Sequence, residues 1–272
     1  MTDTGTDSAL DYKSVKLPSR GVFYGGALPD GGVEVRPLTV DEESLLFASG
    51  GDATEKVHRI IRQCVRFPDG FRISDLLLTD RMAIMLYLRV LSYGPSYNFR
   101  WRCPYCNAAN VSEVNLADDL KDTTPEDVEA TVRRRYSVPD FRVDEPLDVA
   151  LPSGKSLSIR FLRVSDDRTI QQRVRQGRSK GGAGGLEYVL TIALSVVSIG
   201  GREDLRVTER EEWVRRLSAR DGMYLRNFRD DAETGIDTTV HPTCSSCNGD
   251  ADFPLPLDAE FFRPTAVPEG GS

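Results

Sequence analysis

The sequence has few of the residues on which most enzymes depend. Its 272 residues include only two histidines and five cysteines. Nucleophilic catalysis requires a base beside a nucleophile, and neither His58 nor His241 has a nucleophile next to it. Hydrolase chemistry therefore has little support, and we expect a protein that is not an enzyme.

An excess of positive charge is also missing. The chain has 35 Lys and Arg against 42 Asp and Glu, which gives a formal net charge of −7. Nucleic acid is bound through a cationic face that neutralises phosphates. We expect no nucleic-acid partner, although this overall balance still permits a local basic patch.

No long apolar run is present. The longest, Val189 to Ile199, spans eleven residues, whereas a membrane-spanning helix needs ~20. Residues 1–14 are polar and acidic and lack the basic and apolar regions of a secretory signal. We expect no membrane insertion, and a reducing compartment in which disulfides are rare.

Two glycine-containing segments lack the features of nucleotide-binding loops. Gly154-Lys155-Ser156 has Val149 at the position where a phosphate-binding loop requires glycine. The glycines between 177 and 185 lack the strand, fixed spacing and helix that dinucleotide binding needs, and are expected to form a flexible connector. We expect no small-molecule substrate.

Hydrophobic periodicity predicts an α+β fold, in which helices are mixed with small antiparallel β elements. Helices are expected over 40–48, 53–67, 81–92, 125–136, 166–175, 186–199 and 208–217, and strands over 33–36, 97–102, 111–116, 147–151 and 157–161.

Capping patterns set several of the expected helix starts. Thr39 with Glu42 and Thr208 with Glu211 match the capping box, and Asp80 or Thr79 is expected to cap the helix over 81–92. On the helix over 53–67, Cys64 belongs to the apolar stripe. We interpret it as a core residue and the neighbouring His58 as a structural histidine.

Composition divides the chain into five segments. We expect a disordered arm over 1–16, an N-terminal α+β region over 17–120 that ends in a first cysteine pair, and an inserted α/β subdomain over 121–234. A second cysteine pair with a C-terminal strand occupies 235–264, and 265–272 is expected to be a loose tail.

Four of the cysteines form two Cys-x-x-Cys pairs, Cys103/Cys106 and Cys244/Cys247. Such a turn presents two sulfurs from one knuckle, and two knuckles complete the tetrahedron that zinc prefers. Each pair follows a β-like run and precedes small or polar residues, which is the layout of a zinc ribbon. We predict that these four cysteines bind one structural Zn²⁺.

The two pairs are unusually far apart, with 137 residues between Cys106 and Cys244. Because closure entropy grows slowly with loop length, this insertion costs about 2 kcal/mol more than a short one. Structural zinc provides roughly 10–16 kcal/mol of apparent binding energy. The predicted ribbon is therefore discontinuous and joins distant parts of the chain.

Other interpretations of the cysteines remain open. Cys-Pro-Tyr-Cys is also the active-site string of glutaredoxins, but the residues after Cys106 do not start a convincing helix and the second pair would have no purpose. A catalytic zinc would need an open coordination position. His241 could replace a ligand or donate to one, although a bystander role is the simpler interpretation.

Short motifs in a fixed order resemble the baseplate hub family of T-even-like contractile phages. They are Leu17-Pro18-Ser19-Arg20-Gly21 with Tyr24, Arg36-Pro37-Leu38-Thr39, Asp41-Glu42-Glu43, Asp80 with Leu88-Arg89 and Tyr93-Gly94, and the Cys103 pair. A weaker resemblance resumes at Gly235-Ile236-Asp237, the second cysteine pair and Phe261-Phe262-Arg263-Pro264. The middle, 121–234, resembles no family that we can name.

Members of that family are described as hub subunits or as hub assembly chaperones, and relatives occur in contractile injection systems. The resemblance implies a non-catalytic component of a contractile-tail baseplate that binds other baseplate or hub proteins. It also implies a cytoplasmic location during assembly, with or without retention in the virion or injection particle. The alternatives are a cytosolic zinc-ribbon adaptor unrelated to phage and, with less support, a thiol-disulfide oxidoreductase that uses Cys103 and Cys106.

Overall fold

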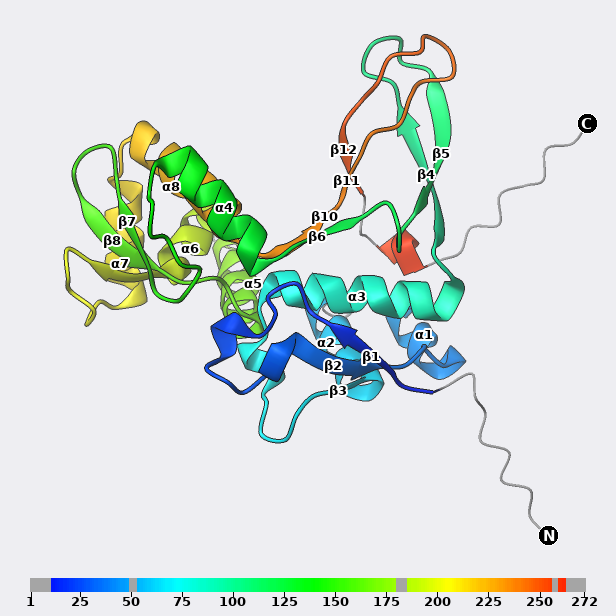
Figure 1. Cartoon of the computed structure of the whole chain (residues 1–272), viewed down its shortest axis with the longest axis horizontal. Helices are drawn as coiled ribbons and strands as arrows, with labels where there is room; N and C mark the ends of the chain where they lie inside the picture. Colours follow the sequence, from blue (N-terminus) through cyan, green and yellow to red (C-terminus); the bar gives the residue numbers. More distant parts are fainter. Residues whose placement is uncertain (1–10, 49–52, 180–184, 256–258, 263–272) are drawn as a thin grey trace, which may run out of the picture.

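The computed structural model describes residues 11–48, 53–179, 185–255 and 259–262. It has the predicted mixed α+β architecture with small antiparallel sheets. The described residues form three groups of elements, and the long helix α3 (Leu78–Tyr93) of the first group contacts the other two (Figure 1). We call them the platform, the inserted group and the ribbon.

The platform contains the N-terminal elements and α3. Strands β1 (Lys13–Lys16), β2 (Gly32–Val35) and β3 (Val65–Arg66) form one antiparallel sheet in that order. Helices α1 (Val40–Phe47) and α2 (Ala53–Cys64) complete the group, together with the short 3-10 turns η2 (Val22–Tyr24), η3 (Pro29–Gly31) and η4 (Ile73–Asp75).

The platform confirms some expectations and corrects others. The predicted capping box of α1 is present, since Thr39 accepts from the backbone N–H of Glu42 and Glu42 reaches back to Thr39. The expected disorder over 1–16 is wrong for residues 13–16, because they pair with β2 as β1, whereas residues 1–10 lie outside the described residues. The expected cap of α3 is also wrong: Leu77 is the N-cap residue and Asp80 lies within the first turn.

The inserted group lies at the opposite end of α3 from the ribbon (Figure 1). It contains α4 (Pro125–Tyr136), α5 (Val164–Ser179), α6 (Leu186–Ser195), α7 (Val207–Arg215) and α8 (Ala219–Ala232). Its sheet has the order β7 (Leu147–Ala150), β8 (Ser156–Ile159), β9 (Val196–Ile199), and all neighbours are antiparallel.

Two helix predictions in this group are wrong in instructive ways. The helix expected over 186–199 ends at Ser195, because the β-branched residues that follow pair with β8 as β9. The capping box expected from Thr208 and Glu211 is wrong: α7 has Arg206, two residues earlier, at its N-cap, and the Arg206 backbone N–H donates to the Glu209 carboxylate at 2.8 Å, while Glu211 forms an ion pair with Arg173. The glycine-rich connector is shorter than predicted, since α5 continues to Ser179; residues 180–184 lie outside the described residues.

The ribbon projects from the platform (Figure 1). Strands β4 (Ser96–Arg102) and β5 (Ala109–Asn115) form one hairpin, and β11 (Thr239–Val240) pairs with β12 (Phe253–Pro254). Strands β6 (Lys121–Thr123) and β10 (Gly235–Asp237) pair where the chain enters and leaves the inserted group, and η5 (Ala259–Phe262) returns to the base of the ribbon near α3.

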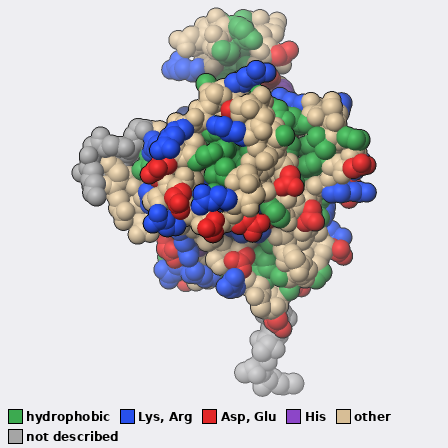
Figure 2. Space-filling model, turned by 90° about the vertical axis from the view of Figure 1, so that its left-hand side faces the viewer, with side chains coloured by type: hydrophobic (Ala, Val, Ile, Leu, Met, Phe, Trp, Pro, Cys, Tyr) green, Lys and Arg blue, Asp and Glu red, His purple; other side chains and the backbone are tan. Residues whose placement is uncertain are grey.

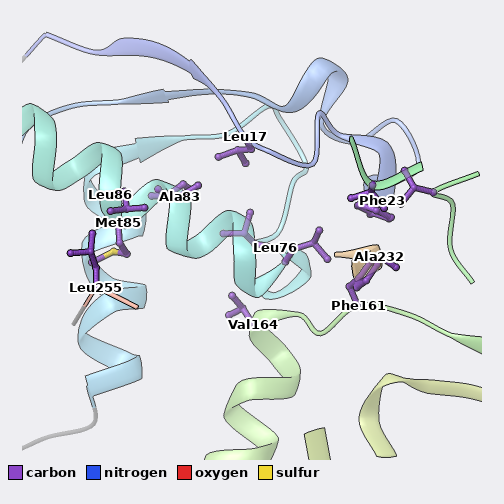
Figure 3. Close-up of a cluster of buried hydrophobic side chains, with 14 of the residues drawn as sticks. Leu17, Phe23, Leu76, Ala83, Met85, Leu86, Phe161, Val164, Ala232 and Leu255 are labelled. Carbon is purple, nitrogen blue, oxygen red and sulfur yellow. The ribbon is translucent and has the colours of Figure 1, made fainter. Parts of the chain in front are cut away.

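One apolar core joins the platform to its neighbours. Phe23 of the platform packs edge-to-face on Phe161, with ring centroids 4.9 Å apart, and both rings lie near Ala232 of α8 (Figure 3). Cys64 is fully buried in this core, as predicted, and His58 is fully buried as well.

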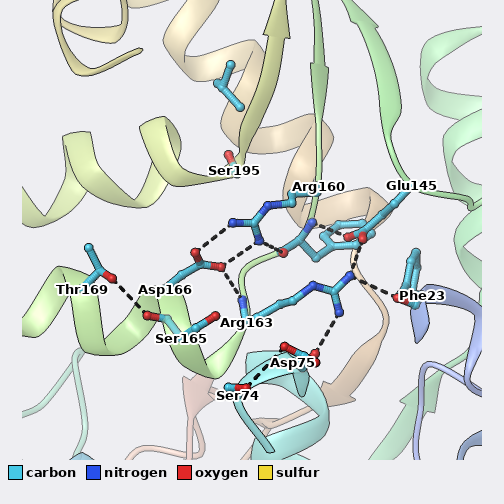
Figure 4. A network of polar contacts seen from close by, with 12 residues as sticks. Phe23, Ser74, Asp75, Glu145, Arg160, Arg163, Ser165, Asp166, Thr169 and Ser195 are labelled. Carbon is cyan, nitrogen blue, oxygen red and sulfur yellow. Dashed lines mark hydrogen bonds and ion pairs between the residues drawn. The ribbon is translucent and has the colours of Figure 1, made fainter. Parts of the chain in front are cut away.

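A polar network reinforces the same junction (Figure 4). Arg163 donates to the carbonyl oxygens of Phe23 and Asp75 at 3.1 and 2.9 Å and forms a 2.6 Å ion pair with Glu145. Arg160 holds Asp166 through two 2.8 Å hydrogen bonds. The two carbonyl contacts of Arg163 tie the inserted group to the platform, whereas the pairs with Glu145 and Asp166 lie within the inserted group. Among the described residues, no helix has both the length and the apolar character that crossing a bilayer requires.

Candidate metal centre

The two Cys-x-x-Cys segments fold into matching knuckles at the tip of the ribbon. In the first, the Asn107 N–H donates to the Cys103 carbonyl at 2.9 Å and the Cys103 N–H donates to Ala108 at 3.0 Å. The second repeats both bonds, from Asn248 to Cys244 and from Cys244 to Gly249, at 2.9 and 3.0 Å. The chain reverses at each asparagine in the left-handed region, with φ of 60° at Asn107 and 55° at Asn248.

The knuckles face each other and bring all four predicted cysteines together. Their sulfur atoms lie within 4.8 Å of one another. The Sγ–Sγ distance is 3.6 Å between Cys103 and Cys247 and 3.7 Å between Cys106 and Cys244. A tetrahedron with ~2.3 Å metal–sulfur bonds has sulfur–sulfur edges of about 3.8 Å, so the spacing fits a four-coordinate thiolate site.

The surroundings of the Cys244 sulfur favour its thiolate. The backbone N–H groups of Tyr105 and Ser246 point at the sulfurs of Cys103 and Cys244, each at 3.4 Å. Hydrogen bonds from the N–H groups of Ser246 and Cys247 lower the pKa of Cys244 to about 6. Cys103 and Cys244 are buried, whereas Cys106 and Cys247 face solvent, and all four thiols are free of disulfide bonds.

Asn110 links the two knuckles, and no pattern in the sequence predicted this role. Its Nδ2 donates to Ala108 O at 3.0 Å and to the Cys244 sulfur at 3.5 Å. Its Oδ1 accepts from the N–H and the hydroxyl of Ser245 at 3.1 and 3.0 Å. One side chain therefore fixes the first knuckle against the second and donates to a sulfur.

Tyr105 and Gly249 form a close contact at the exposed side of the site. The Tyr105 side chain is 71% exposed. A Cβ atom at Gly249 would lie 2.8 Å from Tyr105 Cδ2 and 3.4 Å from the Cys247 sulfur. Glycine at 249 therefore lets the aromatic ring of one knuckle lie over the backbone of the other.

His241 takes no part in the sulfur cluster. Its Nδ1 lies 2.8 Å from the Asp252 carboxylate, and both side chains are exposed. The cluster found among the described residues consists of four cysteines only. The bystander interpretation fits this geometry better than replacement of a ligand.

The base of the ribbon is fastened to the platform by aromatic and arginine contacts. Trp101 of β4 packs on Phe253 of β12 with centroids 5.2 Å apart, which joins the two hairpins. The buried Arg89 of α3 donates to Phe261 O, Gly94 O and Ser96 O at 2.9, 2.9 and 3.3 Å. Each backbone group comes from a segment that ends or begins next to the ribbon, so Arg89 fixes its position on α3.

The N-terminal motif folds onto Asp80 of α3. The carboxylate of Asp80 accepts from the Ser19 N–H at 3.2 Å, from the Ser19 hydroxyl at 2.5 Å and from the Tyr24 hydroxyl at 2.6 Å. Burial raises the pKa of Asp80, and these hydrogen bonds partly oppose that shift. Gly21 sits in the left-handed region with φ of 81°, and a Cβ there would overlap the carbonyl oxygen of Leu28. The motif is therefore an ordered structural element that holds the N-terminal segment against α3.

The geometry opposes the glutaredoxin interpretation. Cys103 follows strand β4, and the residues after Cys106 form strand β5 rather than a helix. No helix N-terminus therefore activates the first sulfur, and the second pair stands next to the first, where a metal would need it.

Comparison with known proteins agrees with the order of the motifs. The model of a family described as T4 bacteriophage base plate protein matches residues 12–263. This range includes residues 121–234, for which the sequence suggested no relative. No curated protein and no solved structure matches this chain.

Proposed function

The chain belongs to the T4 bacteriophage base plate protein family, and from this premise we propose that it is a non-catalytic structural or assembly component of a contractile-tail baseplate. It acts by binding other baseplate or hub proteins. The observation that carries the proposal is the family match over residues 12–263. The adaptor alternative, a protein unrelated to phage, does not account for that match.

We propose further that Cys103, Cys106, Cys244 and Cys247 hold one structural zinc ion. The four sulfurs have tetrahedral spacing, two are buried, and N–H groups are directed at them. When bound, such an ion supplies cross-linking rather than chemistry, because four thiolates leave no coordination position for water. It would join the hairpin of β4 and β5 to the hairpin of β11 and β12 through cysteine pairs that 137 residues separate in sequence.

The division of the chain supports a role as a connector. We propose that 17–120 and 235–264 form one unit held by the metal and that 121–234 is inserted in it. The paired strands β6 and β10 lie where the insertion begins and ends. Two projecting groups on one platform offer separate surfaces for neighbours, and a stable interface needs about 800 Å² on each partner.

The test of the proposal is the location of the protein during and after assembly. Mass spectrometry of purified particles is compared with a pull-down of the tagged chain from cells in which particles assemble. Recovery in both, with baseplate proteins, supports a subunit, and recovery only from assembling cells supports an assembly chaperone. Loss of the chain without any effect on baseplate assembly contradicts the proposal in both forms.

A further inference from the structure

The inserted group has an apolar groove on its outer surface. Residues of three helices line it, among them Tyr188 and Ile192 from α6, Val214 and Arg215 from α7, and Met223 and Arg226 from α8. Its volume is about 510 Å³. A second hollow continues from it past Tyr188, Ile192 and Arg226. Figure 2, which views this side of the molecule, shows hydrophobic side chains exposed among charged side chains of both signs.

Two large side chains at the groove are exposed although they are apolar or aromatic. Met223 is 51% exposed and Tyr188 is 45% exposed. Beneath them, Ile192 and Val214 are buried and provide an apolar floor. Methionine and tyrosine are common anchors of binding surfaces, since one adapts its shape and the other offers a large area at low entropic cost.

The charge around this groove is unbalanced. Its lining contains Arg215 and Arg226 and no carboxylate, while Glu187 and Arg229 line the second hollow beside it. Arg226 lies over the Tyr188 ring, with its Cζ atom 5.7 Å from the ring centroid. Within the described part of the chain, neither arginine forms an ion pair, although most arginines of this protein pair with a carboxylate nearby. In a chain of net charge −7, two unpaired cations beside an apolar floor match a partner that supplies the missing carboxylates.

We propose that this groove binds an amphipathic helix of a partner protein, with apolar side chains in the groove and carboxylates against Arg215 and Arg226. A helix laid in an apolar groove is a common mode of recognition, in which residues one turn apart serve as anchors. The proposal rests on the proposed function, because it specifies the chemistry of one baseplate partner.

The test uses the full-length, zinc-loaded chain and two labelled synthetic helices. Both helices carry leucines on one face; glutamates flank this face in one peptide and lysines in the other. By fluorescence anisotropy at low salt, the glutamate peptide should bind at least about tenfold more tightly, and the difference should shrink as salt is added. Equal binding of the two peptides, or no binding of either, overturns the inference.

Variants locate the binding site. Met223→Asp should abolish binding and Arg226→Glu should favour the lysine peptide, while thermal unfolding stays unchanged because both side chains are exposed. Arg134→Glu is the matched control, since Arg134 is an exposed cation on α4 outside the groove, and it should leave binding intact. Glutamate-peptide binding that survives both groove variants contradicts the inference.

A second copy of the chain is the rival occupant. Sedimentation of the wild type should show a monomer; a dimer that Met223→Asp dissociates would overturn the inference in favour of self-association. Failure of the peptide test in a chain that still associates with assembling baseplates removes the groove proposal alone. Failure of that association removes the proposed function.

Discussion

The ribbon and the platform are held together by different kinds of interaction. Each joins segments that are far apart in sequence: Cys103 meets Cys247 in the ribbon, and Ser19 meets Asp80 in the platform. The platform does this inside an apolar core, where a buried carboxylate accepts three hydrogen bonds. In the ribbon, β11 and β12 have only two residues each, and the four sulfurs hold them against the longer hairpin of β4 and β5.

This difference predicts two independent modes of failure. Loss of a sulfur should unfold the ribbon and leave the platform folded. Loss of a buried polar contact should lower the stability of the platform and leave the sulfur cluster intact.

The largest effect is expected for Cys244→Ser, which removes a buried ligand. Structural zinc contributes roughly 10–16 kcal/mol of apparent binding energy, so its loss should unfold the ribbon. Hydrogen exchange should then lose protection in β4, β5, β11 and β12 and keep it in α3. Cys64→Ser is the matched control, since Cys64 is buried in the platform far from the cluster and should leave the ribbon protected. Equal loss of protection in both regions contradicts the separation.

The next effect is expected for Asp80→Asn. The amide places an NH₂ group among donors from Ser19 and Tyr24, so buried hydrogen bonds are lost and the unfolding free energy should fall by about 2–4 kcal/mol. Denaturant unfolding measures this change, and zinc content should stay at the wild-type value. Asp30→Asn, at an exposed turn, should change stability little. A loss of zinc in Asp80→Asn would show that the two regions are coupled.

Acid should weaken the contact between α2 and α5 through His58. Burial, helped by the nearby Arg168, lowers the pKa of His58 to about 4 from its ordinary value of 6.5, and its Nδ1 faces the Arg168 guanidinium at 2.9 Å. The unfolded chain therefore takes up the proton first, and up to about 3 kcal/mol of stability should be lost as pH falls from 6.5 to 4. His58→Gln should flatten this part of the pH profile, measured by exchange in α2 and α5. An unchanged slope in the variant would assign the loss to other groups.

A smaller effect, on metal affinity alone, is expected for Asn110→Ala. This change removes the donor to the Cys244 sulfur and the link between the knuckles, and outer contacts of this kind are typically worth 10- to 100-fold in affinity. Competition with a zinc chelator measures it. Asn98→Ala, on the neighbouring strand β4 and away from the sulfurs, should bind as the wild type does. Equal affinities of the two variants would remove Asn110 from the site.

The smallest effect is expected for Gly249→Ala. The new methyl group would meet Tyr105 at 2.8 Å, but this ring is exposed and free to turn away, so the cost should be below about 1 kcal/mol. Tyr105→Ala in the same chain should restore stability in thermal unfolding. If the double variant stays as weak as Gly249→Ala, the backbone rather than the ring is the source of the cost.

The sequence predicts features whose cause is local. The Thr39 capping box, the proline that begins α4 and the alternation of β4 depend on neighbouring residues, and each appears in the structure. The cysteine pairs also carry their own signal, because each knuckle is complete within a few residues and sulfur chemistry brings the pairs together.

Features that depend on contacts between segments distant in sequence cannot be predicted in this way. The sequence predicts Asp80 as a helix cap, but in the structure its carboxylate accepts hydrogen bonds from Ser19 and Tyr24. The residues that follow α6 form a strand because they pair with β8. Asn110 and Arg89 act across more than 130 residues, on Ser245 and Phe261. Nothing in the local sequence of Asn110 distinguishes it from a surface polar residue, and the motif that contains Arg89 does not reveal the contact with Phe261.

The central claim is that four sulfurs and one zinc ion close the ribbon, and metal counting on the intact folded chain tests it most directly. Native mass spectrometry should find one zinc per chain and no disulfide, with Cys103, Cys106, Cys244 and Cys247 protected from alkylation until a chelator removes the metal. A folded, metal-free chain whose ribbon keeps its exchange protection, or one with disulfides within the two pairs, would contradict it.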